Sequence, residues 1–231
     1  MIDLHKSRLV LTSFIGVATA LTRILGFFRD VLLAALFGAS PAADAFFVAL
    51  RLPNMIRRLM GEGGFASGYI PVIHRLKRDH DPQRLENFIT DSFLWIIIGC
   101  LILMIIFEMI ANPLITILAP GLPLTIRDYA VSYFRAFIPL IAGVMLTGYF
   151  SAILIQAQKF IGQALIPLIT NIGLVAVLAV FLLQSTGDLY HQGLVLSWTA
   201  SALTFIQVAF LGYFACREMS PFSIRLPRRN R

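Results

Sequence analysis

Long apolar runs constrain the fold of this chain more than any other feature. Residues 160–183, for example, contain no charged side chain. An apolar segment of about 20 residues crosses the hydrocarbon core of a bilayer as one helix. The chain has 231 residues, of which 58% are hydrophobic and only 13% are charged, against about a quarter charged in soluble domains. These runs and this composition place the chain in a membrane and exclude an ordinary soluble globular domain.

Six such runs predict an all-α membrane protein with six transmembrane helices. The expected helices cover residues 9–37, 44–73, 88–110, 129–156, 160–183 and 193–216. Clusters of proline and glycine separate several of them, and "FGASPAAD" at 37–44 predicts a tight turn between the first two helices. Asp44 is expected to cap the second helix. "APGLP" at 119–123 predicts a short structured loop.

The connections between these helices have a strongly uneven distribution of basic residues. Twelve lie on one side of the expected membrane: Lys6, Arg8, Arg75, Lys77, Arg78, Arg84, Lys159, Arg217, Arg225, Arg228, Arg229 and Arg231. The connections on the other side hold one, Arg127. Because basic residues gather on the cytoplasmic side, this pattern predicts that both termini are cytoplasmic.

An alternative for the N-terminus is a signal peptide over residues 1–20, with a basic start, an apolar run and "ATA" at 18–20. The apolar pattern continues to Phe37, and removal of the first 20 residues would leave an odd number of spans. Both observations favour a retained first helix. The sequence has no spacing typical of a metal site, a catalytic nucleophile with its base, or a phosphate-cradling loop, so no cofactor and no catalytic residue is expected.

Charged side chains inside the expected helices are the main anomaly. An arginine at the bilayer centre costs about 2.5–3.5 kcal/mol, so these residues should face protein or a water-filled cavity. In the first helix the small and polar residues recur every three or four positions, which places them on one face. They are Thr12, Gly16, Thr19, Arg23, Gly26 and Asp30. Arg29 lies about a third of a turn from this face and would join it only if the helix bends, for which Gly26 is the expected place.

The second helix repeats this pattern. Asp44, Arg51, Arg58 and Glu62 follow one face, with Asn54 beside it. Pro53 predicts a kink, and "GEGG" at 61–64 predicts irregular backbone, which membranes tolerate only where it lines a cavity or is buried in protein. Arg57 and Arg58 either belong to the cavity or mark the cytoplasmic end of the helix.

The two charged helices carry five arginines against three carboxylates, so an excess of positive charge survives complete pairing. One interpretation is a structural network of ion pairs; the other is a cavity that binds an anion. The planar guanidinium suits phosphate and carboxylate, so an arginine cluster favours a doubly charged group such as a pyrophosphate. Arg135 either lines the cavity or lies at the outer interface. The isolated Asn171 and Gln207 are expected to form hydrogen bonds between helices.

The stretch over residues 22–72 resembles the MurJ/MviN family of bacterial lipid II flippases. The resemblance rests on "TRILGFFRD", "FGASPAADAFFVALRLPNMIRR" and "EGGFASGYIPV". It continues through "APG" at 119–121, "IP" at 138–139 and the residues Pro167 and Asn171. No comparable motif points to a nucleic-acid partner.

This resemblance implies one lobe of a two-lobe transporter of the multidrug and oligosaccharidyl-lipid exporter (MATE-like) fold, in the bacterial inner membrane. The implied substrate is lipid II, the undecaprenyl-pyrophosphate-linked precursor of peptidoglycan, and hence a role in cell wall biogenesis and cell shape. The implied substrate-binding residues are Thr22, Arg23, Arg29 and Arg51. Cavity or gate positions are implied for Asp30, Asp44, Asn54, Arg57, Arg58 and Glu62.

Members of that family are about twice as long as this chain or longer. We therefore expect an N-terminal lobe at residues 1–216 and a basic cytoplasmic tail at 217–231, with a second lobe supplied in cis or in trans. Repeat-based transporters move one bundle against another, so one lobe is half of such a device. The alternatives are a drug or cation antiporter of the same fold, which would need a cavity dominated by carboxylates, and a truncated membrane scaffold that does not transport.

Overall fold

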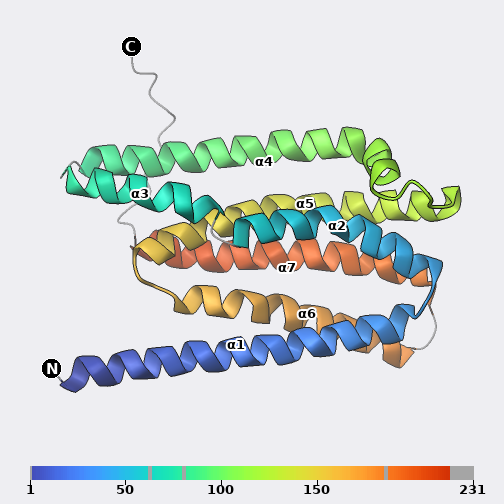
Figure 1. Cartoon of the computed structure of the whole chain (residues 1–231), viewed down its shortest axis with the longest axis horizontal. Helices are drawn as coiled ribbons and strands as arrows, with labels where there is room; N and C mark the ends of the chain where they lie inside the picture. The colour runs from blue at the N-terminus through green and yellow to red at the C-terminus, as the bar shows by residue number, and fades with distance from the viewer. Residues whose placement is uncertain (1, 62–63, 80–81, 185–186, 219–231) are drawn as a thin grey trace, which may run out of the picture.

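The protein is described from a computed structural model over residues 2–61, 64–79, 82–184 and 187–218. This part of the chain is all helical, as the sequence predicts. Seven helices follow one another (Figure 1): α1 (Ile2–Phe37), α2 (Pro41–Gly61), α3 (Gly64–Arg78), α4 (Pro82–Leu118), α5 (Leu124–Gln156), α6 (Ile161–Gln184) and α7 (Leu189–Glu218).

The predicted tight turn joins α1 to α2. Gly38 has a φ of 53°, the left-handed conformation that closes many helices, and its amide donates to the carbonyl of Ala34 at 2.9 Å. The predicted cap was wrong by one turn. Ser40 caps α2, because its hydroxyl accepts a hydrogen bond from the amide of Ala43 at 3.2 Å and Pro41 opens the helix. Asp44 lies inside the first turn instead.

The predicted second helix at 44–73 is two helices. α2 ends at Gly61 and α3 begins at Gly64, and Glu62 lies outside the described residues. The break between the two described helices coincides with "GEGG" at 61–64, where the sequence predicts irregular backbone. Pro53 lies within α2 and Pro71 within α3. The expected tail at 217–231 also falls almost wholly outside the described residues.

The helices run along the long axis of the molecule, with α5 near the centre (Figure 1). α5 packs against α2, α3, α4 and α7, whereas α1 packs against α6 at one edge. Figure 1 shows α1 and α6 beside each other, apart from the layer formed by α2, α5 and α7. α6 in turn contacts α7, so most of α1 reaches the rest of the bundle through α6, whereas its C-terminal end packs directly through Phe37 against Phe46 of α2. This arrangement leaves space between α1 and α2.

Two clusters of buried apolar residues hold the bundle together. The first lies near the α1–α2 turn and contains Phe37, Phe46, Phe137 and Leu196. The second joins α3, α5 and α7 at the opposite end, around Tyr149, which is fully buried. Packing of this kind, rather than transfer of apolar groups out of water, is the main force between helices in a membrane.

Within the described ranges, four helices are long and apolar enough to cross a bilayer: α4, α5, α6 and α7. The described part of α1 carries Arg23, Arg29 and Asp30, and α2 carries four charged residues within 21 positions. Composition alone therefore does not mark these two helices as spans. The chain has the architecture of a multi-pass membrane protein, and the first two helices carry charged residues along their length.

Candidate functional site

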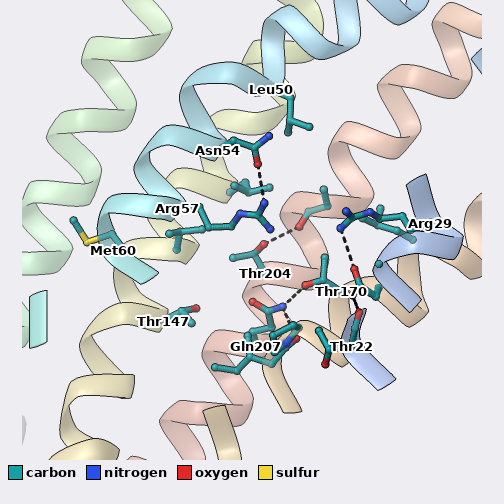
Figure 2. A pocket seen from close by; sticks show the side chains of 18 of the residues that line it. Thr22, Arg29, Leu50, Asn54, Arg57, Met60, Thr147, Thr170, Thr204 and Gln207 are labelled. Atoms are coloured by element: carbon teal, nitrogen blue, oxygen red, sulfur yellow. Dashed lines mark hydrogen bonds between the residues drawn. The ribbon is translucent and has the colours of Figure 1, made fainter. Parts of the chain in front are cut away.

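A cavity of about 810 Å³ lies between α1, α2, α5, α6 and α7. Near the α1–α2 turn its walls are apolar, with Phe46, Phe137 and Leu196 from the first cluster. Its middle is polar, and Figure 2 shows Arg29 and Arg57 pointing toward each other across this part. A cavity of this size within apolar helices, with charged groups in its middle, is the expected form of a ligand site.

Arg29 is held in the cavity by a partner on its own helix and by one on α6. Its Nε and Nη2 atoms donate to one carboxylate oxygen of Asp30 at 2.9 and 2.7 Å, and Nη1 donates to Oδ1 of Asn171 at 3.0 Å. Asn171 lies on α6, is only 5% exposed, and donates from Nδ2 to the carbonyl of Thr22 at 3.1 Å. Asn171 thus orients the guanidinium and ties α6 to α1.

Arg57 reaches the cavity from α2. Its Nη2 atom donates to Oδ1 of Asn54 at 3.0 Å, so its partner is a neutral amide on the same helix (Figure 2). Two arginines and one carboxylate, Asp30, line the cavity among the described residues. The cavity wall therefore has a net positive charge, because Asp30 compensates only one guanidinium. The Arg29–Asp30 pair is part of the ion-pair network that the sequence suggested. Arg57 supplies the predicted excess of positive charge.

Five of the residues proposed from the sequence line this cavity: Thr22, Arg29, Asp30, Asn54 and Arg57. Four others do not, namely Arg23, Asp44, Arg51 and Arg58, and all four are exposed on the described surface. Arg51 donates from Nη1 to the carbonyl of Leu118 at the end of α4, at 2.9 Å.

The predicted face of the first helix needs a correction. α1 continues without interruption through Gly26, and Arg29 lines the cavity while Arg23 lies exposed outside it. No break at Gly26 is required, because the cavity faces Thr22, Gly26 and Arg29, a stripe rotated from the predicted one. Sequence spacing defines which residues share a face but not which way that face turns once the helix packs.

Arg135 lies on α5 outside the cavity. Its Nε atom pairs with Oε1 of Glu108 on α4 at 2.9 Å, and both side chains are about half exposed. Met104 and Trp198 lie beside this pair. The sequence left open whether Arg135 lines the cavity or lies at the outer interface. Arg135 does not line the cavity between α1 and α2.

Sequence reasoning missed a neutral polar wall contributed by α5, α6 and α7. Its members are hydroxyl and amide side chains: Thr147, Ser151, Gln163, Thr170, Thr204 and Gln207. Gln207 fulfils the predicted role of an interhelical bond, since its amide donates to the carbonyl of Ile166 at 3.0 Å and also to the hydroxyl of Thr170. The sequence feature that could have indicated this wall is the spacing of Thr147, Gly148 and Ser151. It places small and polar residues on one face of an apolar helix.

The site has the chemistry of an anion receptor. Two guanidinium groups present forks of N–H donors toward the cavity, and hydrogen bonds from them to an anion would be charge-assisted. No group of three or more histidine, cysteine or acidic residues that would hold a metal ion occurs in the described ranges.

Comparison with known proteins gives related sequences and a related fold. The family model described as "Lipid II flippase MurJ" matches residues 33–231. A probable lipid II flippase MurJ of Buchnera aphidicola subsp. Acyrthosiphon pisum is 32% identical over 163 residues, which cover 70% of this chain and 32% of that protein. The lipid II flippase MurJ of Burkholderia cenocepacia is 30% identical over 179 residues, covering 75% of this chain and 33% of that protein.

A relative from Rhizobium tropici, also a probable lipid II flippase MurJ, is 29% identical and covers 93% of this chain. The alignment takes in 40% of that relative, so this chain spans about a third to two fifths of the curated proteins that it matches. Among solved structures, a lipid II flippase MurJ in an inward closed conformation superposes with a TM-score of 0.71. The superposition covers 91% of this chain and 43% of that one at 24% identity, which shows a shared fold.

Proposed function

The chain belongs to the MurJ family of lipid II flippases, and we propose that it forms the N-terminal lobe of a transporter that moves lipid II across the bacterial inner membrane. In this proposal the pyrophosphate of lipid II binds in the cavity between α1 and α2, and the lipid chain stays in the bilayer. The protein makes and breaks no covalent bond. It supplies a polar path through the hydrocarbon for a head group that would not cross it alone.

The observation that carries this proposal is the pair of guanidinium groups, one from α1 and one from α2, that point toward each other in the cavity (Figure 2). Arg29 and Arg57 together carry more positive charge than Asp30 compensates. Two facing forks suit the two phosphates of a pyrophosphate. The same charges argue against the alternative of a cation antiporter, because Asp30, the one carboxylate that lines the cavity among the described residues, is already engaged by Arg29.

The membrane arrangement follows from the charge distribution. We propose six spans, with α2 and α3 together forming one of them, in a MATE-like lobe with both termini in the cytoplasm. A second lobe, in cis or in trans, supplies the opposing wall, against which this lobe rocks. Arg23, Arg51 and Arg58, which are exposed here, belong in this proposal to the surface that faces that lobe or to the gate. An inside-negative potential favours outward movement of the anion by about 2.3 kcal/mol per charge per 100 mV.

A direct test uses this chain together with its second lobe, in cis or in trans, which we call the full-length protein. It is expressed in a bacterium depleted of its own flippase. Growth and exposure of lipid II at the outer face of the membrane are measured together. Both should be restored to the level obtained with the native flippase. A protein that inserts into the membrane at a normal level but leaves lipid II on the inner face contradicts the proposal.

Neutralising Asp30 is expected to tighten binding of the anion. In the full-length protein, Asp30→Asn removes the carboxylate that engages Arg29 through two hydrogen bonds. The Asp30 side chain is 64% exposed, so water screens its charge. In a water-like dielectric a unit charge about 4 Å away contributes about 1 kcal/mol, so affinity for a polyprenyl diphosphate should rise roughly fivefold. Titration of the purified protein with that lipid measures the change. A weaker affinity would mean instead that Asp30 orients Arg29 for the ligand.

A further inference from the structure

The cavity has two walls of different chemistry. The wall on α1 and α2 carries the charged residues, whereas the neutral polar wall on α5, α6 and α7 carries hydroxyl and amide groups and no charge. In Figure 2, Thr147, Thr170 and Gln207 lie together on one side of Arg57. This wall has no charge of its own, and its hydroxyl and amide groups can both donate and accept, so it is suited to a neutral polar part of a ligand.

The two walls meet at a defined level of the bundle. Met60 lies one turn beyond Arg57 on α2 and packs against Gly148 on α5. A Cβ atom added to Gly148 would lie 3.8 Å from the Cβ of Met60. The neutral polar wall therefore begins beside Arg57. On α6 it extends to Gln163, eight residues from the Asn171 that holds Arg29, which is about 12 Å along the helix. A ligand group attached directly to a bound diphosphate would lie along this wall.

Part of the hydrogen-bonding capacity of the wall is not used within the protein. The Thr147 hydroxyl is buried and has no hydrogen-bond partner among the described residues. A buried hydroxyl without a partner is unfavourable, and a ligand group at the cavity edge would satisfy it. Gln163 is positioned by a bond from its amide to the carbonyl of Ser151 at 2.9 Å, so α5 and α6 are fixed relative to each other at this point.

We infer that the neutral polar wall is a saccharide subsite, which recognises the hydroxyl- and amide-bearing glycosyl group carried by the diphosphate. This inference rests on the proposed function and assigns the two walls to two parts of one substrate. The arginines bind the diphosphate of any polyprenyl carrier. Thr147, Ser151 and Gln163 distinguish a carrier that bears sugar from a bare one, because unpaired polar groups in the site would disfavour the bare lipid.

The experiment compares two lipids on the full-length protein in nanodiscs: a polyprenyl diphosphate, and the same lipid bearing a disaccharide. The tested variant is Thr147→Val with Ser151→Ala, which removes two hydroxyls with little change in volume. We expect the wild type to prefer the glycosylated lipid. The variant should bind the glycosylated lipid about tenfold more weakly, as expected for the loss of one or two hydrogen bonds, and should bind the bare diphosphate within twofold of wild type.

Thr199→Val is the matched control, because that hydroxyl bonds its own helix at Val195 and does not line the cavity. Equal weakening for both lipids, or no change for either, would overturn the subsite while leaving the flippase proposal intact. A wild type that binds neither lipid would overturn the flippase proposal itself. Thermal unfolding of the variant within a few degrees of the control establishes that a loss of affinity is not a loss of fold.

Discussion

Transport of lipid II is expected to fall by about 30- to 150-fold when Arg29 is replaced by glutamine in the full-length protein. The substitution removes a charge-assisted bond to the diphosphate, which contributes about 2–3 kcal/mol. It also leaves Asp30 without its partner, so a carboxylate would then face the anion. Outer-face exposure of lipid II in flippase-depleted cells, normalised to the amount of protein in the membrane, measures the effect.

The chain offers a matched control for this prediction. Arg135→Gln removes an arginine that also pairs with a carboxylate at 2.9 Å but lies outside the cavity. It should leave transport near the wild-type level. Arg29→Lys should be intermediate, because lysine keeps the charge but loses the planar fork. If Arg29→Gln and Arg135→Gln reduced transport equally, the role of the cavity as the diphosphate site would be refuted.

The second large effect concerns stability. Tyr149 is fully buried where α3, α4 and α5 meet, and its hydroxyl donates to the carbonyl of Ile89 at 2.8 Å. Its ring packs against those of Phe65, Tyr69 and Phe93. Tyr149→Ala should lower the free energy of unfolding by about 3 kcal/mol, because truncating a buried aromatic side chain leaves a cavity. The midpoint of thermal unfolding in detergent should fall by roughly 6–12 °C.

Tyr149→Phe separates the two contributions of this residue. It keeps the ring packing and removes the hydroxyl, so it should cost about 1 kcal/mol, the net contribution of one hydrogen bond, because the carbonyl of Ile89 still accepts from the Ser92 hydroxyl at 3.0 Å. An alanine variant that unfolds at the wild-type temperature would show that the second cluster contributes little to the stability of the lobe.

The pattern of apolar runs predicted much of the fold. Each predicted helix corresponds to observed helix, and the turns at "FGASPAAD" and "APGLP" are where the sequence places them. The errors are local. Ser40 rather than Asp44 caps α2, because Pro41 starts the helix one turn earlier, and the predicted second helix divides at its glycine-rich segment.

The site was predicted less completely, and the reason is geometric. Residues near one another in sequence were found by their charge, as with Arg29, Asp30 and Arg57. Asn171 lies 142 positions from Arg29, and the pattern of its own helix identifies it only as a polar residue among apolar ones. Its contact with the guanidinium appears only when α6 packs beside α1.

The sequence by itself determined that this chain is helical, lies in a membrane, and carries more arginine than carboxylate in its first two helices, because these properties depend on composition and local spacing. The tertiary structure decided which arginines share a cavity. It turned α1 so that Arg29 rather than Arg23 faces inward, brought Arg57 opposite, and added a neutral polar wall from three later helices. Rotation of a helix about its axis is set by the surfaces packed against it, and periodicity along one helix does not specify those surfaces.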